Sequence, residues 1–228
     1  MPVAQDTWKT ALPEETDFWR KWFETKGLQW PDSYAWRIDP NYEFYAHLRP
    51  YVKLPQGSTV RVLDVGAGPL TVLGKVWPGY TLDITAVDPL AHEYDKLIDE
   101  FKIKPLVRTQ YGHGEKLLDQ FPESSFDLVY AENCIDHSYD PLLCFSQMLS
   151  VVKPGCYVAT DHLVNEGTNE KYEGLHQWNF DVKGLFQKRF VIWRPNAKPI
   201  DVQDYFGTRA KVSANLTKRH VYAYIQKT

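Results

Sequence analysis

The pattern of hydrophobic positions changes near residue 59. From there on, short apolar runs rich in β-branched residues alternate with segments whose apolar residues recur at helical spacing. Strands are predicted at residues 59–65, 80–88, 104–110, 126–133 and 156–162, and helices at residues 69–75, 91–101 and 141–152. Two further strands, at residues 189–193 and 220–227, are expected to form a finishing antiparallel hairpin across a long polar loop. This alternation predicts an α/β fold in which helices flank a mostly parallel sheet.

The first 57 residues differ from the rest of the chain, because their apolar residues recur at helical spacing and many of them are aromatic. Residues 12–27 predict an amphipathic helix that begins at Pro13 and ends at Lys26-Gly27. We expect residues 1–57 to form a helical cap and residues 58–228 to form one compact domain. The aromatic residues of the cap either close over a binding site as a lid or cover one edge of the core. The orientation of Trp19, Trp22 and Trp36 distinguishes these two interpretations.

Composition and charge restrict the kinds of partner. The chain has 228 residues, 43% of them hydrophobic, which suits a single well-packed domain. Its net charge of −3 argues against broad binding to nucleic acid, so a small molecule is the expected partner. Insertion into a membrane is not expected, and the first ten residues do not resemble a secretory signal, which predicts a cytoplasmic protein. The three cysteines, Cys134, Cys144 and Cys156, form no CxxC pair and predict reduced thiols. A homo-oligomer is left open.

The stretch VLDVGAGPLTVLG, residues 62–74, predicts a buried strand followed by a glycine turn. Gly66 and Gly68 allow the backbone to approach a ligand closely. Asp64, two residues before the first glycine, would repel a pyrophosphate and attract an ammonium group. Asp88, 24 positions further on, can accept both hydroxyls of a ribose. A ligand with an amino acid end and a ribose end is S-adenosylmethionine.

Five motifs together resemble the class I S-adenosylmethionine-dependent methyltransferases. VLDVGAGPL, AVDP, GEKL, FDLVYAEN and VVKPG occur in the order and at the spacing of that family, over about residues 59–162. The resemblance implies a Rossmann-like, seven-stranded sheet and S-adenosylmethionine as cofactor. It also implies a set of cofactor-binding residues: Asp64, Gly66 and Gly68 around the methionine portion, Asp88 at the ribose, Asn133 near the sulfonium, and Glu115.

This chain departs from the family pattern at two positions. Leu70 stands where the family has its third glycine, and His113 stands in the region that often supplies an acidic residue near adenine. The adenine contacts are therefore left open.

The loops after the fourth and fifth predicted strands are unusually polar, which predicts a polar acceptor such as a hydroxylated metabolite or sugar. Methyl transfer to a hydroxyl gains from a base, and His137 and His176 are the candidate catalytic residues, although either could instead be a hydrogen-bonded structural histidine. The predicted substrate-binding residues are Asp136, His162, Asn165, Glu166 and Trp178. Two alternatives stay open: methylation of an amine nitrogen, and a non-catalytic S-adenosylmethionine-binding or scaffolding protein. Methylation of nucleic acid is disfavoured because ENCI, residues 132–135, lacks the proline-rich pattern of the amino-methylating DNA enzymes.

A divalent metal is a further alternative that the sequence does not favour. Metal-dependent O-methyltransferases hold magnesium or calcium with an acidic residue after the fourth strand and a pair after the fifth. Glu132 and the pair Asp161-His162 fall near those positions. The histidine departs from the pattern because these hard cations prefer oxygen ligands.

Overall fold

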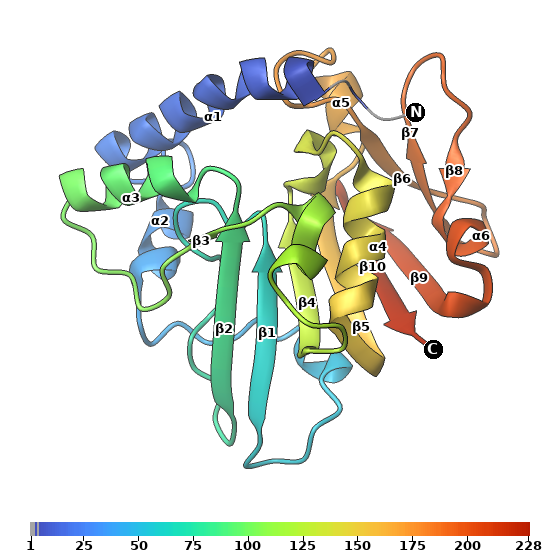
Figure 1. The fold of residues 1–228 in the computed structure, drawn as a ribbon, viewed down its shortest axis with the longest axis horizontal. Coiled ribbons are helices and arrows are strands. Elements are labelled where there is room, and N and C mark those ends of the chain that lie inside the picture. Colours follow the sequence, from blue (N-terminus) through green and yellow to red (C-terminus); the bar gives the residue numbers. More distant parts are fainter. Residues whose placement is uncertain (1–2, 4) are drawn as a thin grey trace.

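The computed structural model describes residue 3 and residues 5–228, and its centre is a seven-stranded sheet with the order β3-β2-β1-β4-β5-β10-β9 (Figure 1). The strands are β1 (Thr59–Val65), β2 (Thr81–Asp88), β3 (Gln110–Tyr111), β4 (Phe126–Glu132), β5 (Val152–Leu163), β9 (Ala210–Thr217) and β10 (His220–Lys227). Strands β1 to β5 pair in parallel, and β10 pairs antiparallel with both β5 and β9. The predicted α/β fold with a mostly parallel seven-stranded sheet is confirmed.

Both faces of the central strands are buried, as expected for a parallel sheet covered on two sides. Val62 packs on one face against Phe44 and Leu48 of the N-terminal segment. Leu63, the next residue along β1, packs on the other face with Phe145 of α4 (Pro141–Val151). The side-chain alternation of a strand thus connects the sheet to two different layers.

The remaining helices are α1 (Gln5–Thr25), α2 (Pro31–Ile38), α3 (Ala91–Glu100), α5 (Glu166–Asn169) and α6 (Val202–Phe206), with short 3₁₀ segments η1 (Arg49–Tyr51), η2 (Gly114–Asp119), η3 (Ile135–His137) and η4 (Gly207–Arg209). Helix α4 begins as predicted, because the Asp140 side chain accepts a hydrogen bond from the Leu143 amide. Within the described residues, no helix combines the length and apolarity needed to cross a membrane.

Helix α1 is longer than predicted, since it begins at Gln5 and contains Pro13. Proline lacks an N–H and normally interrupts a helix. Here Trp8 and Ala11, in the turns before the proline, are buried against Tyr139 and Leu175, so tertiary packing holds the first turns in place. Figure 1 shows α1 lying across the carboxyl ends of the parallel strands.

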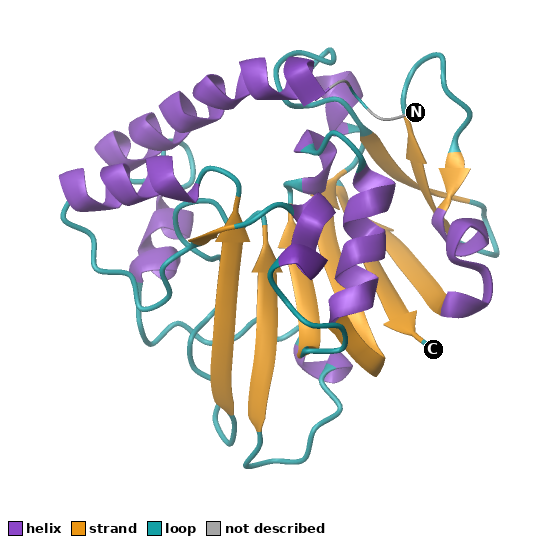
Figure 2. Ribbon diagram, viewed as in Figure 1, coloured by secondary structure: helices purple, strands orange, loops and turns teal. Residues whose placement is uncertain are grey.

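The helix predicted at residues 69–75 is wrong, because the chain between β1 and β2 is a loop (Figure 2). Gly74 lies directly on the N-terminal segment, where an added Cβ would be 2.0 Å from the Glu43 carbonyl oxygen. The Lys75 amide donates to the Tyr42 carbonyl, and the Phe44 amide donates to the Val76 carbonyl. The N-terminal aromatic segment therefore occupies the layer in which a crossover helix would have packed.

The structure corrects two predictions at the carboxyl end and one at the sheet edge. A second sheet, with the order β6-β7-β8, is formed by β6 (Asn179–Lys183), β7 (Arg189–Trp193) and β8 (Ile200–Asp201). The hairpin partner of β10 is β9, not β7. Strand β9 was missed from the sequence because most of its residues are exposed at the sheet edge. The polar residues on this exposed face resemble those of a loop. At the other edge, β3 spans two residues and not the predicted stretch 104–110.

Candidate active site

The carboxyl ends of the parallel strands, together with α1 and α2, enclose a cavity of about 1130 Å³. An open α/β sheet binds ligands at this edge. The cavity is lined by most of the residues that the sequence singled out: Asp64, Gly66, Gly68, Asp88, Glu115, Glu132, Asn133, His137, Asp161, Glu166 and His176. The fold thus brings the glycine turn and the polar loops into one site.

The glycine turn admits no side chain at either of its two glycines. Gly66 and Gly68 have φ values of +67° and +64°, in the left-handed region that favours glycine. A Cβ added to Gly66 would lie 2.5 Å from the Cys134 sulfur, and one added to Gly68 would lie 2.8 Å from Cζ2 of Trp19. Both the conformation and the close packing therefore require glycine here.

The two aspartates that the sequence assigned to the cofactor are buried beside this turn. Asp88 accepts hydrogen bonds from the amides of Gly68 at 3.1 Å and Leu90 at 2.9 Å, which fixes its carboxylate at the end of β2. Asp64 accepts a hydrogen bond from the Thr71 hydroxyl at 2.5 Å. Burial raises the pKa of each carboxyl to about 7. A cationic ligand at this position would favour the ionised forms of both.

Arg37 of α2 is a cavity residue that the sequence reasoning missed. Its Nη1 donates to the Leu70 carbonyl of the glycine turn at 2.5 Å, and its guanidinium lies 5.4 Å from the ring centroid of Trp19. Burial lowers the pKa of Arg37. Arg37 directly follows Trp36 in the aromatic-rich stretch of the cap, and this cation among aromatic residues was the signal that could have identified it.

Trp19, Trp22 and Trp36 all line the cavity, so the aromatic cap faces the cleft. The indole Nε1 of Trp36 is buried and has no hydrogen-bond partner among the described residues. It is a free donor that a bound ligand could use.

Two predicted cofactor residues are held by the protein itself. Glu115 accepts a hydrogen bond from the Tyr139 amide at 3.1 Å, and its burial raises the pKa of its carboxyl. Asn133 has a left-handed backbone with φ of +46°, and its side-chain oxygen accepts from the Leu163 amide at 3.3 Å. Both residues line the cavity, but these bonds give each a structural role there.

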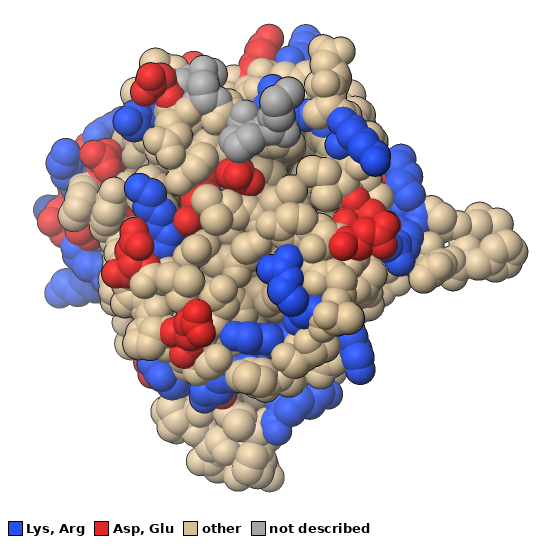
Figure 3. Space-filling model, turned by 45° about the vertical axis from the view of Figure 1, so that its right-hand side comes forward, with Lys and Arg blue, Asp and Glu red and all other residues tan. Residues whose placement is uncertain are grey.

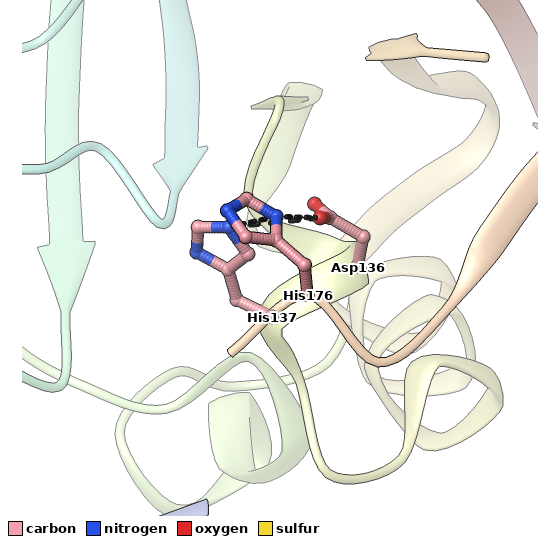
Figure 4. A group of neighbouring side chains, drawn as sticks. All are labelled: Asp136, His137 and His176. Atoms are coloured by element: carbon pink, nitrogen blue, oxygen red, sulfur yellow. Dashed lines mark hydrogen bonds and ion pairs between the residues drawn. The ribbon is translucent and has the colours of Figure 1, made fainter. Parts of the chain in front are cut away.

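His137 and His176 meet at the cavity wall, although they come from loops 39 residues apart (Figure 4). Nε2 of His137 lies 3.1 Å from Nδ1 of His176. That same Nδ1 lies 2.9 Å from Oδ2 of Asp136, a buried residue behind the pair. Burial acts to lower the pKa of His176, but the hydrogen bond to Asp136 outweighs it and the pKa is raised. For Asp136, burial acts to raise the pKa, and the two imidazoles outweigh it, so the pKa is lowered.

Four predicted substrate-binding residues do not line the cavity. Asp136 supports His176 from behind, as described above. Trp178 is buried in the core and donates to the Ser138 carbonyl at 3.0 Å. Asn165 precedes α5 and accepts from the Trp193 indole at 3.0 Å. His162 is buried against Phe180, with ring centroids 4.6 Å apart, and burial lowers its pKa to about 4. Of the predicted acceptor-binding set, Glu166 alone reaches the cavity lining.

The structure brings together only two of the three residues of the alternative metal set, because Glu132 and Asp161 are register partners on β4 and β5, whereas His162 is buried in the core. Glu132 accepts a hydrogen bond from the Tyr130 hydroxyl at 2.6 Å, and Asp161 pairs with His220 at 2.7 Å. Strand alternation explains the result, because adjacent residues of β5 point to opposite faces and His162 points into the core.

Comparisons with known proteins agree with this geometry. Residues 63–160 match the family model described as a methyltransferase domain. An uncharacterised methyltransferase of Schizosaccharomyces pombe is 27% identical over 135 residues, which is 56% of this chain and 46% of that protein. Phosphoethanolamine N-methyltransferase 2 of Caenorhabditis elegans is 24% identical over 131 residues, 54% of this chain and 30% of that protein. The chain therefore spans less than half the length of either curated relative.

Among solved structures, the CMeT domain of the citrinin polyketide synthase has a similar fold, with a TM-score of 0.52 and 15% sequence identity. The similarity covers 76% of this chain and 48% of that one.

The matched segment contains the glycine turn and both aspartates predicted to bind the cofactor, Asp64 and Asp88. Residues 63–160 therefore match a methyltransferase domain, and they belong to a mostly parallel, Rossmann-like sheet. This segment resembles S-adenosylmethionine-dependent methyltransferases, whose cofactor is S-adenosylmethionine.

Proposed function

We propose that this chain is an S-adenosylmethionine-dependent methyltransferase that transfers the methyl group to a hydroxyl oxygen of a polar small molecule, and that the pair His137 and His176 activates that hydroxyl. The observation that carries the proposal is the position of the pair. Both imidazoles line the same cavity as Asn133, the residue that the family pattern places near the sulfonium. Asp136 supports the pair from behind, as a carboxylate supports a catalytic imidazole.

The size of the cavity favours an enzyme over a non-catalytic scaffold that only binds the cofactor. Pockets for single ligands of drug size usually measure about 300–1,000 Å³. The cavity here, about 1130 Å³, has room for a cofactor and a small acceptor together. This volume counts against the non-catalytic scaffold, which would need a cofactor pocket without space for an acceptor.

The charges along the cavity support a division between a cofactor end and an acceptor end. At the cofactor end, Asp64 is placed to attract the ammonium group and Arg37, bonded to the glycine turn, to attract the carboxylate of the methionine portion. Asp88 is placed to accept the ribose hydroxyls. At the acceptor end, Glu166 and His176 provide hydrogen-bonding groups for a polar molecule.

The aromatic cap is proposed to act as a lid. Trp19 contacts the glycine turn and α1 lies over the strand ends, so a bound cofactor would be covered by this segment. Closure of such a segment excludes water from the transferring methyl group.

A small molecule remains the proposed acceptor class. On the face drawn in Figure 3, Lys and Arg side chains are interspersed with Asp and Glu side chains. A phosphate backbone is bound by surfaces on which basic residues predominate.

Methylation of an amine nitrogen is the second candidate, favoured by the acidic lining. The carboxylates of Glu132, Asp161, Glu166 and Glu170 all reach the cavity and would attract an ammonium-bearing acceptor. The relative from Caenorhabditis elegans is, by its name, an N-methyltransferase. An amine requires less help from a base, because its neutral form already carries a lone pair.

The test is to incubate the purified chain with S-adenosylmethionine and matched alcohol and amine acceptors, and to measure S-adenosylhomocysteine. We expect methylation of alcohols, reduced at least about 100-fold in His137→Ala and His176→Ala, in line with the usual contribution of a proton-transferring group. His92→Ala, at an exposed histidine stacked on Tyr111, is the matched control. Turnover of amines alone, unaffected by either substitution, would instead establish the second candidate.

A further inference from the structure

We propose that Asp136, His137 and His176 form a binding site for one divalent transition-metal ion of the Zn²⁺ or Fe²⁺ type. Oδ2 of Asp136, Nε2 of His137 and Nδ1 of His176 lie within 4.8 Å of one another (Figure 4). The three pairwise separations are 2.9 Å from Asp136 to His176, 3.1 Å from His137 to His176, and 3.6 Å from Asp136 to His137. The three atoms therefore form a small triangle with similar sides.

This triangle has the size of one face of a metal coordination shell. Metal–ligand bonds of about 2.0–2.2 Å place neighbouring ligand atoms about 3.3 Å apart in a tetrahedron and about 3.0 Å apart in an octahedron. The observed separations span both values. An ion could therefore be accommodated with small side-chain movements.

Hydrogen bonds alone cannot satisfy all three of these atoms at once. If Nδ1–H of His176 donates to the Asp136 carboxylate, Nε2 of His137 either competes for the same proton or directs its own proton against it. A cation at the meeting point would accept a lone pair from all three atoms. The other carboxylate oxygen, Oδ1 of Asp136, is buried and has no hydrogen-bond partner among the described residues, so Asp136 is incompletely satisfied by the protein itself.

The surroundings suit a cation that remains open to the cavity. The Asp136 side chain is 2% exposed, whereas those of His137 and His176 are 17% and 28% exposed and line the cavity. Glu166 and Glu170 line the same cavity and add negative charge. Three protein ligands with a remaining open position are typical of catalytic metal sites.

The ligand chemistry selects the class of metal. Two imidazole nitrogens and one carboxylate oxygen suit Zn²⁺ or Fe²⁺ better than Mg²⁺ or Ca²⁺, which prefer oxygen ligands. This set also differs from Glu132, Asp161 and His162, of which the structure brings only the first two together.

The role of the ion rests on the proposed function, whereas the site rests on its geometry alone. The ion would bind the acceptor hydroxyl at its open coordination position and lower the pKa of that hydroxyl. The oxygen–carbon bond then forms as the sulfur–carbon bond of S-adenosylmethionine breaks, S-adenosylhomocysteine leaves, and the hydroxyl proton is released to water. The imidazoles would then bind the ion and would not accept the hydroxyl proton directly.

The site can be tested without any turnover. The full chain, freed of any histidine tag and stripped with a chelator, is titrated calorimetrically with Zn²⁺, and with Co²⁺ to record the visible absorption that reports coordination geometry. We expect one ion per chain, with the affinity weakened at least about 100-fold in His137→Gln, His176→Gln and Asp136→Asn, beyond the 10–100-fold usual for residues behind the ligands. His92→Gln is the matched control and should bind as the unaltered chain does.

Absence of stoichiometric binding, or binding that the three substitutions leave unchanged, would overturn the site. Because Asp136 is buried, far-ultraviolet circular dichroism checks folding, and the two partly exposed histidines carry the test if Asp136→Asn unfolds. Methyl transfer to alcohols is then compared in stripped and reloaded protein. Full activity in the stripped protein would overturn the catalytic role of the ion, whereas failure of both forms on alcohols would overturn the proposed function and leave the binding result intact.

Discussion

The ring of Trp19 rests on Gly68, so that a Cβ at this glycine would come within 2.8 Å of the indole. This contact joins the cap to the glycine turn. Helix α1 precedes the matched segment in sequence, but its aromatic face contributes to the wall of the cavity. The cap and the cofactor turn are therefore expected to respond together to substitution.

Gly68→Ala should weaken binding of S-adenosylhomocysteine by at least tenfold. The new methyl group must displace Trp19, and it also places an L residue at a φ of +64°. Gly207→Ala is the matched control, because Gly207 has a similar φ of +57° and nothing lies within 4 Å of an added Cβ. Both substitutions should lower the free energy of unfolding by at least about 1–2 kcal/mol through the backbone conformation, and Gly207→Ala by more because its ψ of −124° lies outside the left-handed helical region. Calorimetric titration that finds equal binding losses in the two variants would contradict a special role for the Trp19 contact.

Asp88→Asn should weaken binding of both S-adenosylhomocysteine and 5′-methylthioadenosine, which keeps the adenosine but lacks the amino acid portion. Loss of hydrogen bonds to a charged group costs about 1.5–3 kcal/mol, or roughly 10–100-fold in affinity. Asp83→Asn, at the exposed opposite end of β2, is the control and should leave both affinities unchanged. Retained affinity for 5′-methylthioadenosine in Asp88→Asn would remove Asp88 from the ribose.

Several elements were predictable because local sequence and tertiary packing agree. Strand β4 is mostly apolar in sequence and buried on both faces, and α4 has an aspartate cap followed by proline, so pattern and structure coincide there. The candidate cofactor residues Asp64 and Asp88 were chosen from their positions near the carboxyl ends of β1 and β2, and both line the cavity. Each of these features is encoded within about ten neighbouring residues.

The errors arise where distant segments decide the outcome. Residues 69–75 form a loop because residues 42–44 pack on them, and the spacing within that stretch contains no record of this contact. The meeting of His137 with His176 depends on the path of the loop after β5, although both histidines were individually predicted. Arg37 was missed for the same reason, since its importance comes from its contact with the Leu70 carbonyl.

The contribution of Asp64 and Asp88 to the stability of the ligand-free protein should fall as the pH rises from about 4 to about 7. In this window the unfolded chain has lost the protons of Asp64 and Asp88, whose ordinary pKa is 3.8, whereas burial raises their pKa to about 7 in the folded protein. At these two carboxyls folding takes up protons, so their contribution to the free energy of unfolding decreases with pH until it levels off above about pH 7. Urea unfolding at a series of pH values measures this slope.

Asp88→Asn should reduce that slope, whereas Asp83→Asn should not. Because cationic S-adenosylmethionine favours the ionised carboxylates, its affinity should increase over the same pH range in the unaltered protein. An identical slope in Asp88→Asn and the unaltered chain would show that Asp88 ionises normally despite its burial.

Arg37→Ala should distinguish the two ends of the cofactor. If the guanidinium binds the carboxylate of the methionine portion, the substitution weakens S-adenosylhomocysteine by about 10–100-fold, the usual value for a charged hydrogen bond. Binding of 5′-methylthioadenosine, which has no carboxylate, should change by less than about threefold. Arg20→Ala, which removes an exposed arginine of α1 paired with Glu100 at 2.6 Å, is the control. Arg37 also contacts the Trp19 ring and the Leu70 carbonyl, so a purely structural role predicts equal losses for both ligands. Calorimetric titration of both ligands against the unaltered chain, Arg37→Ala and Arg20→Ala separates these outcomes. An affinity loss in Arg37→Ala that is confined to S-adenosylhomocysteine means that the guanidinium binds the carboxylate, which 5′-methylthioadenosine lacks.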